Sequence, residues 1–280
     1  MKDIVVAIDF SKGSAHALEY AIELGNITES NIIMVWVDNQ SVLEPHITIE
    51  SSELREESKK GLEELANNYR RKLKPGKITY KIRKGKVYQE LAAQAKQSEC
   101  AILVTGTHGV TGFEEYWIGS NASRVVAYSP CPVISVKYNY DINRGIRKIL
   151  LPIDHTPQTV HKAFFTTVFA KHFGADIKIL ALYTSRLKTL QRVVDNHVAR
   201  VEKYFSGQNV NYIVDTLITD NLTTAIIDHA REEDVDLISI ITDTQNEVTA
   251  TILGQFAQQL VNYSPVPVLS IPLKEHFVLA

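Results

Sequence analysis

The chain has 280 residues, of which 45% are hydrophobic and 22% are charged, and its formal net charge is −2 at pH 7. This length suits about two domains at ~150 residues each, and the composition is that of an ordinary globular protein. The near-neutral charge argues against a strongly basic nucleic-acid binder, and no run approaches the ~18 apolar residues of a transmembrane helix.

The first half of the chain alternates between short apolar runs and helical patterns. The apolar runs are rich in Val and Ile and nearly continuous, which favours parallel strands covered on both faces. We predict strands near residues 3–9, 31–37, 77–83, 100–106 and 132–137, and helices near 13–26, 51–73, 87–98 and 120–129.

The second half repeats the first. The segment "KDIVVAIDFSKGSAHALEYAIELG" (2–25) resembles "RKILLPIDHTPQTVHKAFFTTVFAKHFG" (147–174), and "YSPCPVISVKY" (128–138) is matched by "YSPVPVLSIPL" (263–273). Self-similarity at this scale indicates two domains of one fold rather than a solenoid. The strands of the second copy are predicted near 147–153, 177–183, 210–218, 236–242 and 266–271.

Strand–helix alternation with short connections indicates an α/β fold with right-handed crossovers. We predict two similar, doubly wound domains of five parallel strands each, Rossmann-like or flavodoxin-like, with strand order 3-2-1-4-5. The domains span residues 1–140 and 146–280, joined by the polar segment "NYDINRG" (139–145).

Two cysteines, Cys100 and Cys131, are too few for a disulfide framework. The N-terminus passes from Met1 into a strand pattern that is too brief and too early for a signal peptide. We therefore expect a protein of the reducing cytoplasm, with neither nucleic acid nor membrane as a partner.

Glycines follow the fourth strand of the first copy, at positions 106, 109, 112 and 119, and the last is followed by Ser120. In an open parallel sheet, ligands bind beyond the carboxyl ends of the strands, where the strand order reverses. With order 3-2-1-4-5 this point lies between the first strand, which ends at Asp9, and the fourth, which ends at Gly106.

This combination of residues is suited to phosphate. Glycines let backbone N–H groups approach a ligand closely, and Ser120 can cap a helix whose free N–H groups face an anion. The loop matches neither a Rossmann fingerprint, which would follow the first strand, nor a Walker A loop, because Gly119-Ser120 lacks the lysine.

The spacing Gly106-x2-Gly109-x9-Gly119-Ser120 resembles the ATP-binding signature of the universal stress protein family. The segments "IVVAIDFS" (4–11) and "SPCPVISV" (129–136) are also similar to that family. The resemblance covers both copies, hence nearly the whole chain, as a tandem universal stress protein.

The resemblance implies a role for each matching position. Asp9 would lie near the ribose or a bound Mg²⁺, and the backbone of Val37 would bind adenine, an assignment that rests on the resemblance alone. The remaining implied residues surround ribose and phosphates or lie beside them: Gly106, His108, Gly109, Gly119, Ser120 and Asn121. Asp9 could instead cap the helix after the first strand, and the glycine loop could be a tight connection only.

The second copy departs from this pattern. Alignment of Gly119 with Gly254 places Ile241 and Thr244 at the positions of Gly106 and Gly109, and Gln255 replaces Ser120, while Asp154 keeps the place of Asp9. Added Cβ atoms and the charges of Asp243 and Glu247 would oppose phosphate. We therefore predict that this copy binds ATP poorly and serves to complete an intrachain pseudo-dimer.

We predict an ATP-binding regulatory protein of the stress response, with ATP, ADP or AMP as ligand and an unknown protein partner. Catalysis of phosphoryl transfer needs a base and a cation near the phosphates, and the loop offers neither lysine nor arginine. An enzyme is therefore disfavoured, although a metal held by Asp9 could support weak ATPase activity. A nucleotide-independent scaffold and a homodimer stay open as alternatives.

Overall fold

The computed structural model describes residues 3–39, 50–107, 120–242 and 253–273, apart from the side chains at positions 50–52 and 120. The chain divides into two compact units, with the boundary between Ile142 and Asn143. We call them the N-terminal unit and the C-terminal unit and describe each by itself.

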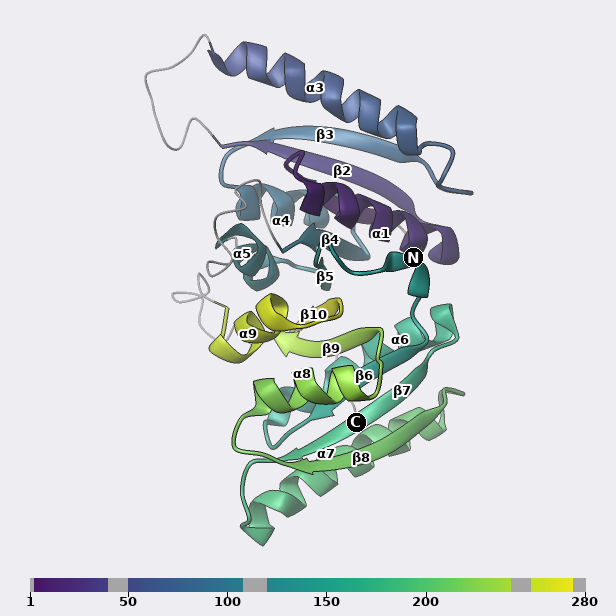
Figure 1. Cartoon of the computed structure of the whole chain (residues 1–280), viewed down its shortest axis with the longest axis vertical. Helices are drawn as coiled ribbons and strands as arrows, with labels where there is room; N and C mark the ends of the chain where they lie inside the picture. Colours follow the sequence, from purple (N-terminus) through teal and green to yellow (C-terminus); the bar gives the residue numbers. More distant parts are fainter. Residues whose placement is uncertain (1–2, 40–49, 108–119, 243–252, 274–280) are drawn as a thin grey trace. The chain divides into compact units, whose positions relative to one another are not determined.

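The N-terminal unit is built on one parallel sheet (Figure 1). Its strands are β1 (Asp3–Ile8), β2 (Asn31–Asp38), β3 (Ile78–Lys84), β4 (Ile102–Gly106) and β5 (Val133–Val136). Its described helices are α1 (Lys12–Thr28), α3 (Glu50–Tyr69), α4 (Val87–Gln97) and α5 (Ser120–Tyr128). The strands pair in the order β3-β2-β1-β4-β5, which is the predicted 3-2-1-4-5.

The C-terminal unit repeats this arrangement. Its strands are β6 (Lys148–Ile153), β7 (Asp176–Tyr183), β8 (Tyr212–Ile218), β9 (Leu237–Thr242) and β10 (Val268–Pro272). Its described helices are α6 (Lys162–Phe173), α7 (Lys188–Ser206), α8 (Leu222–Glu232) and α9 (Gln255–Tyr263), with 3₁₀ turns η1 (Ile142–Arg144) and η2 (Pro157–Val160). The parallel order is β8-β7-β6-β9-β10, again 3-2-1-4-5.

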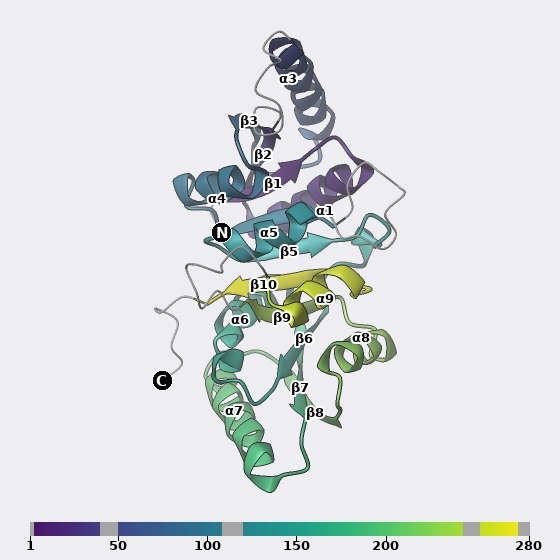
Figure 2. The same cartoon turned by 90° about the vertical axis from the view of Figure 1, so that its left-hand side faces the viewer.

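Helices cover both faces of each sheet (Figure 2). In the N-terminal unit α4 packs against α5, and in the C-terminal unit α8 packs against α9. Coverage on both faces explains the continuous apolar runs: Ile4, Val5 and Val6 alternate in direction along β1, and all three are fully buried.

The predicted strands are confirmed, with each end displaced by two residues or fewer. The helix predicted to run to residue 73 ends earlier, at Tyr69. The side chain of Asn26 on α1 accepts from the N–H of Lys74 and donates to the C=O of Lys72. These hydrogen bonds pair the backbone groups of the turn after α3, where Pro75 follows Lys74 and disfavours a helix. The predicted pseudo-dimer of the two copies stays a prediction.

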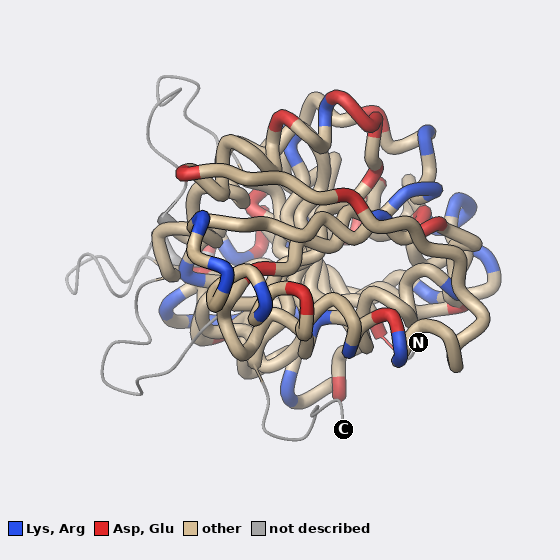
Figure 3. The backbone as a smooth tube through the Cα atoms, turned by 90° about the horizontal axis from the view of Figure 1, so that it is seen from below, with Lys and Arg blue, Asp and Glu red and all other residues tan. Residues whose placement is uncertain are grey.

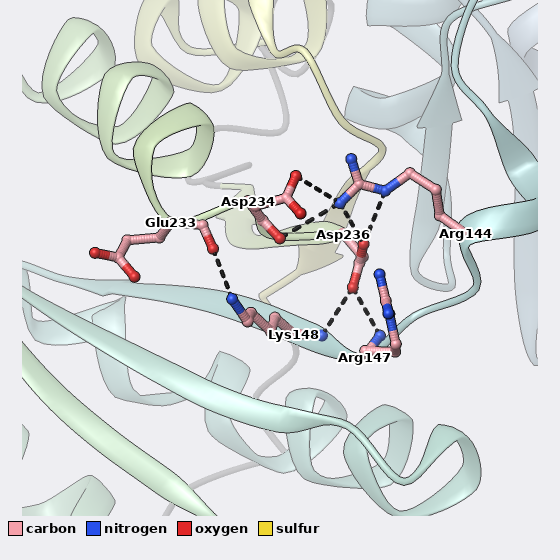
Figure 4. Close-up of polar contacts among 6 residues, drawn as sticks. All are labelled: Arg144, Arg147, Lys148, Glu233, Asp234 and Asp236. Atoms are coloured by element: carbon pink, nitrogen blue, oxygen red, sulfur yellow. Dashed lines mark hydrogen bonds and ion pairs between the residues drawn. The ribbon is translucent and has the colours of Figure 1, made fainter.

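A buried carboxylate joins the amino ends of β6 and β9 in the C-terminal unit (Figure 4). Asp236 is 1% exposed, and its Oδ2 accepts from the backbone N–H groups of Arg147 (2.8 Å) and Lys148 (3.0 Å). Its Oδ1 accepts from Nε (3.2 Å) and Nη2 (2.9 Å) of Arg144, which also binds Asp234. The hydrogen bond to Asp234, with support from Asp236, raises the pKa of the Arg144 guanidinium.

The two cysteines are neighbours. Cys100 precedes β4 and Cys131 precedes β5, both are buried, and their Sγ atoms are 3.7 Å apart. The hydrogen bond with Cys131 and burial together raise the pKa of the Cys100 thiol, which makes it a poor nucleophile.

Basic and acidic residues are interspersed along the described chain (Figure 3). This mixture fits the net charge of −2 and differs from the basic stripe of a nucleic-acid-binding surface.

Candidate functional site

A cavity of about 250 Å³ lies in the N-terminal unit at the carboxyl ends of β1, β2 and β4. The chain leaves β1 and β4 toward opposite faces of the sheet here, which makes this the place where the strand order reverses. Its described lining residues are Ala7, Ile8, Asp9, Ser11, Ser14, Val35, Trp36, Val37, Asn39, Val87, Leu91, Thr105, Gly106, Thr107, Asn121, Ala122 and Val125.

The lining combines apolar and polar residues. Apolar side chains such as Val35, Leu91 and Val125 form a part that we call the apolar floor, and the polar lining residues are of the types Ser, Thr, Asp and Asn. Among the described lining residues none is Lys, Arg or His. The arrangement suits an apolar ring that carries hydroxyl substituents more than a compact polyanion alone.

Four of the eight predicted site residues line this cavity: Asp9, Val37, Gly106 and Asn121. They lie in β2, β4 and α5 and directly after β1, so the fold brings together positions that are far apart in sequence. His108, Gly109 and Gly119 lie outside the described residues, as does the side chain of Ser120.

Asp9 holds the turn between β1 and α1. Its Oδ1 accepts from the N–H of Ser11 at 2.9 Å, and its own N–H donates to Oγ of Ser14 at 3.3 Å. The helix cap is Ser11, whose side chain accepts from the N–H of Ser14, so the alternative that Asp9 caps the helix is wrong. The Asp9 side chain is exposed at the rim of the cavity, where Oδ1 is engaged by the turn.

Val37 lies one residue beyond the end of the β1–β2 ladder, whose last pair is Ile8 with Trp36. The C=O of the next residue, Asp38, accepts from the N–H of Gly85 on the β3 side. Since successive peptide groups alternate between the two neighbouring strands, the backbone of Val37 faces the β1 side, where that strand has ended. Its peptide group therefore borders the cavity.

Gly106 ends β4 and is required by packing. A Cβ at this position would lie 2.7 Å from the carbonyl oxygen of Gly13 and 2.8 Å from its carbonyl carbon, in the first turn of α1. Our sequence-based reason for this glycine, close approach of backbone to a ligand, is thus incomplete. The residue also lets α1 begin against the end of β4, and this contact shapes one wall of the cavity.

Helix α5 begins at Ser120, where the signature predicts a helix start, and its first turns border the cavity through Asn121, Ala122 and Val125. The free N–H groups of a helix start attract anions, and the helix dipole adds to this attraction. The site therefore has an apolar floor beside an anion-attracting helix start.

Sequence reasoning missed several residues that border the site. Ser11, Ser14, Thr105 and Thr107 also line the cavity, and the signal was available in their places beside Asp9 and Gly106. A further contact has no local signal, because its partners lie 17 positions apart: Nε of Arg55 on α3 binds Oδ2 of Asp38 at 2.9 Å. The Asp38 side chain is 1% exposed, so this pair ties α3 to the end of β2.

The C-terminal unit keeps the turn and changes its surroundings. Oδ1 of Asp154 accepts from the N–H of Thr156 at 2.9 Å, and the N–H of Asp154 donates to Oγ1 of Thr159 at 3.2 Å, as Asp9 does in the N-terminal unit. Ile241 takes the place of Gly106. Its Cβ leaves no room for the close approach that Gly13 makes, and the first turn is the 3₁₀ turn η2, with α6 starting only at Lys162.

Lys162 takes the place of Ala17 and is 5% exposed. Its Nζ donates to Oγ1 of Thr159 at 3.0 Å, beside the carboxylate of Asp154. Burial lowers the pKa of this lysine to about 8, against the opposing attraction of Asp154. The C-terminal unit thus carries its own cation where the N-terminal unit has its cavity.

The described residues of the N-terminal cavity could hold a metal ion only together with a bound ligand that supplies further donor atoms. Among the described residues, no group of three or more His, Cys, Asp or Glu side chains could hold a metal. Asp9 is the one carboxylate among the described lining residues. One carboxylate together with phosphate oxygens and water is a ligand set that Mg²⁺ accepts.

Comparisons with known proteins agree with the repeat. A model of the universal stress protein family matches residues 1–137 and again residues 145–272. The chain is 30% identical over 146 residues to the universal stress protein YxiE of Bacillus subtilis, which covers 48% of this chain and 97% of that protein. It is 22% identical over 225 residues to the universal stress protein Rv2319c of Mycobacterium tuberculosis, covering 74% of this chain and 77% of that protein.

A solved structure shows the same fold over the full length. The structure of a universal stress protein from Archaeoglobus fulgidus has a TM-score of 0.78 and 19% sequence identity, and the match covers 96% of this chain and 98% of that chain. In the part of the chain that the structure describes, no helix has the length and apolar character needed to cross a membrane.

Proposed function

Since the chain belongs to the universal stress protein family, we propose that its N-terminal domain, residues 1–140, binds an adenine nucleotide, and that the C-terminal domain, residues 146–280, is mainly structural. The ligand is ATP, or ADP or AMP, which share its nucleoside. The protein acts as a regulator whose nucleotide occupancy alters its shape or its choice of partner, and catalysis is not its main role.

One observation carries this proposal: a single cavity is lined by Asp9, Val37, Gly106 and Asn121. The apolar floor would take the adenine, the backbone of Val37 would bind its edge, and Asp9 would meet the ribose or a Mg²⁺ ion on the phosphates. The volume of about 250 Å³ is just below the ~300 Å³ at which small-molecule pockets begin. The phosphates would therefore extend out of the cavity along the start of α5.

A structural role for the C-terminal domain is supported by Lys162. Its ammonium group lies beside Asp154 and Thr159, where the N-terminal domain offers Asp9 and Ser14 to the cavity. A buried internal cation that already faces the strand-end aspartate reduces the need for a nucleotide-borne Mg²⁺ there. Ile241 adds a side chain where Gly106 has none.

The test is calorimetric titration of ATP and Mg²⁺ into the full chain. Helices α5 and α9 have equal lengths, so residues 120 and 121 correspond to Gln255 and Phe256. A variant with Ser120→Gln and Asn121→Phe places the C-terminal pair at the N-terminal site. We expect one site per chain in the wild type and at least a ~10-fold weaker affinity in this variant, because residue 121 lines the cavity and a phenyl ring there would narrow it.

The matched control is the reverse exchange, Gln255→Ser with Phe256→Asn, which leaves the affinity unchanged. Two equivalent sites per chain would show that the C-terminal domain also binds nucleotide. Absence of binding with ATP, ADP and AMP alike would overturn the nucleotide proposal and leave the scaffold alternative. Release of phosphate by the wild type, lost in Asp9→Asn, would establish the weak ATPase instead.

A further inference from the structure

The two edges that β3 and β8 form at the outer ends of their sheets differ in character. Each strand pairs with one neighbour among the described strands, β3 with β2 and β8 with β7, so each presents unpaired backbone groups on its other side. Such an edge is a ready template for pairing with another strand.

β3 carries the protection that edge strands usually have, and β8 does not. The exposed side chains of β3 are Thr79, Lys81 and Lys84, and lysines on an edge discourage pairing with another chain. On β8 the exposed side chains are mostly apolar: Ile213 is 56% exposed, Val214 37% and Ile218 62%.

The helix beside each edge explains part of this difference. On β3 the hydroxyl of Tyr80 donates to Glu63 of α3 at 2.7 Å, so α3 contacts the row of side chains that the even-numbered residues of this strand form. On β8 the first residue of the same row, Tyr212, contacts Phe205 of α7 with ring centroids 5.5 Å apart. Farther along this row Val214 and Ile218 are exposed, and they need a cover that α7 does not give.

The backbone of β8 defines which residues can pair outward. The C=O of Asn211 accepts from Ile177 and the N–H of Thr219 donates to Tyr183, so the odd-numbered residues face β7. The even-numbered residues from 212 to 218 therefore direct their N–H and C=O groups away from the sheet. Their side chains form the row to which Val214 and Ile218 belong.

We propose that two copies of this chain associate through β8, as an antiparallel pair centred on Thr216. In this register Thr216 lies opposite Thr216 of the other copy, and Val214 lies opposite Ile218, twice by symmetry. All of these are hydrogen-bonded pairs of outward-facing residues, and each copy covers the apolar row of the other.

The alternative registers are less favourable. A pair centred on Asp215 would place the two Asp215 carboxylates directly opposite each other at the close, non-hydrogen-bonded spacing of ~4.5 Å between Cα atoms. A pair centred on Val214 would leave Ile218 opposite Val210, which lies before the start of β8. A second copy is thus a better occupant than an unrelated strand, because the strand matches itself in one register.

The first test is sedimentation equilibrium of the full chain over a range of concentrations. Val214→Lys with Ile218→Lys introduces the protection that β3 has, and we expect it to raise the dimer dissociation constant at least ~10-fold. Ile27→Lys on α1 is the matched control, because Ile27 is an exposed apolar residue away from any strand edge (46% exposed), and it leaves association unchanged. A wild type that stays monomeric, or a dimer that the two lysines do not weaken, would overturn the proposal.

The second test reads the register. In Thr216→Cys the two introduced residues face each other with Cα atoms ~5.5 Å apart, which suits a disulfide, whereas in Val214→Cys they are displaced along the strands. Oxidation by copper phenanthroline should link Thr216→Cys into a covalent dimer and leave Val214→Cys unlinked. Equal linkage at both positions, or linkage at Val214→Cys alone, would contradict this register.

Discussion

The two units have the same strand order and the same aspartate turn, yet the place where β1 meets β4 is a cavity and the corresponding place in the C-terminal unit holds a lysine. The two places differ at one glycine position, which bears on how the following helix packs. Gly106 lets the first turn of α1 approach to a distance that a Cβ would forbid, whereas Ile241 accompanies a 3₁₀ turn and a later helix start. Two copies of one fold can thus pack differently at the same strand end, with the acidic residue retained.

The largest effect is expected at the amino ends of β6 and β9. Asp236→Ala removes an acceptor that serves Arg144 and two backbone N–H groups, and it should lower the free energy of unfolding by about 3–5 kcal/mol, because a guanidinium and buried donors lose their partner. Denaturant titration measures the loss, and hydrogen exchange should accelerate at Arg147 and Lys148. In the N-terminal unit, Ala101 occupies the position that corresponds to Asp236. Its N–H donates to the C=O of Asp3, but it has no carboxylate that could accept further hydrogen bonds. A loss below 1 kcal/mol would show that the cluster contributes little to the stability of the C-terminal unit.

Replacement of the buried Lys162 should raise the free energy of unfolding, whereas Asp236→Ala lowers it. Its pKa is lowered from 10.5 to about 8, so at pH 7 the charged form is present in both the folded and the unfolded state and destabilises the fold. Lys162→Met should therefore raise the free energy of unfolding at pH 7 by up to about 3 kcal/mol, at ~1.4 kcal/mol per pKa unit.

This gain should depend on pH. Between pH 8 and 10.5 the folded wild type releases the proton while the unfolded chain retains it, so the wild type becomes more stable as pH rises and the advantage of Lys162→Met shrinks. Lys171→Met, at an exposed position of the same helix, is the control with no such trend. Thermal unfolding at pH 7 and pH 10 measures both, and a difference that stays constant with pH would assign the effect to packing rather than charge.

The packing of α1 against the end of β4 can be tested by adding one methyl group at Gly106. Gly106→Ala places a Cβ 2.7 Å from the carbonyl oxygen of Gly13, and it should cost about 1–3 kcal/mol of unfolding free energy because α1 must shift. Gly207→Ala is the control, since its φ is −89° and its Cβ would come no closer than 3.7 Å to the described structure, at the carbonyl oxygen of Tyr204. Equal effects at the two positions would mean that Gly106 is not held by its contact with α1.

The smallest effect concerns the helix starts. Ser11→Ala removes the side chain that accepts from the N–H of Ser14, and it should cost about 1 kcal/mol. His161→Ala at the start of α6 removes a residue that makes no side-chain cap bond, and we expect a smaller loss. Chemical unfolding of both variants makes the comparison. A larger loss at His161 would show that α6 depends on its cap residue more than α1 does.

Much of the fold could be predicted because its signals are local. Continuous Val and Ile runs locate the strands to within two residues, since strands covered on both faces bury successive side chains such as Ile4, Val5 and Val6. The glycine spacing indicates the correct end of the sheet, and Asp9, Val37, Gly106 and Asn121 line one cavity there. The packing reason for Gly106 was not apparent, because it depends on how closely α1 approaches β4. The cap, Ser11, had a local signal in its position three residues before Ser14, and this signal was missed.

The order of residues is enough to predict the duplication and the parallel α/β class, because these follow from repetition and periodicity. The strand order and the end of the sheet that carries the candidate site were predicted from the fold type that this pattern fits. The order of residues does not reveal that Lys162 is buried with its Nζ on Thr159, that Arg55 reaches Asp38, or that β8 directs its even-numbered backbone groups outward. These depend on contacts between segments far apart in sequence and on which residue of a strand faces its neighbour. Packing and strand register settle such matters, and neither is encoded in any single stretch of the chain.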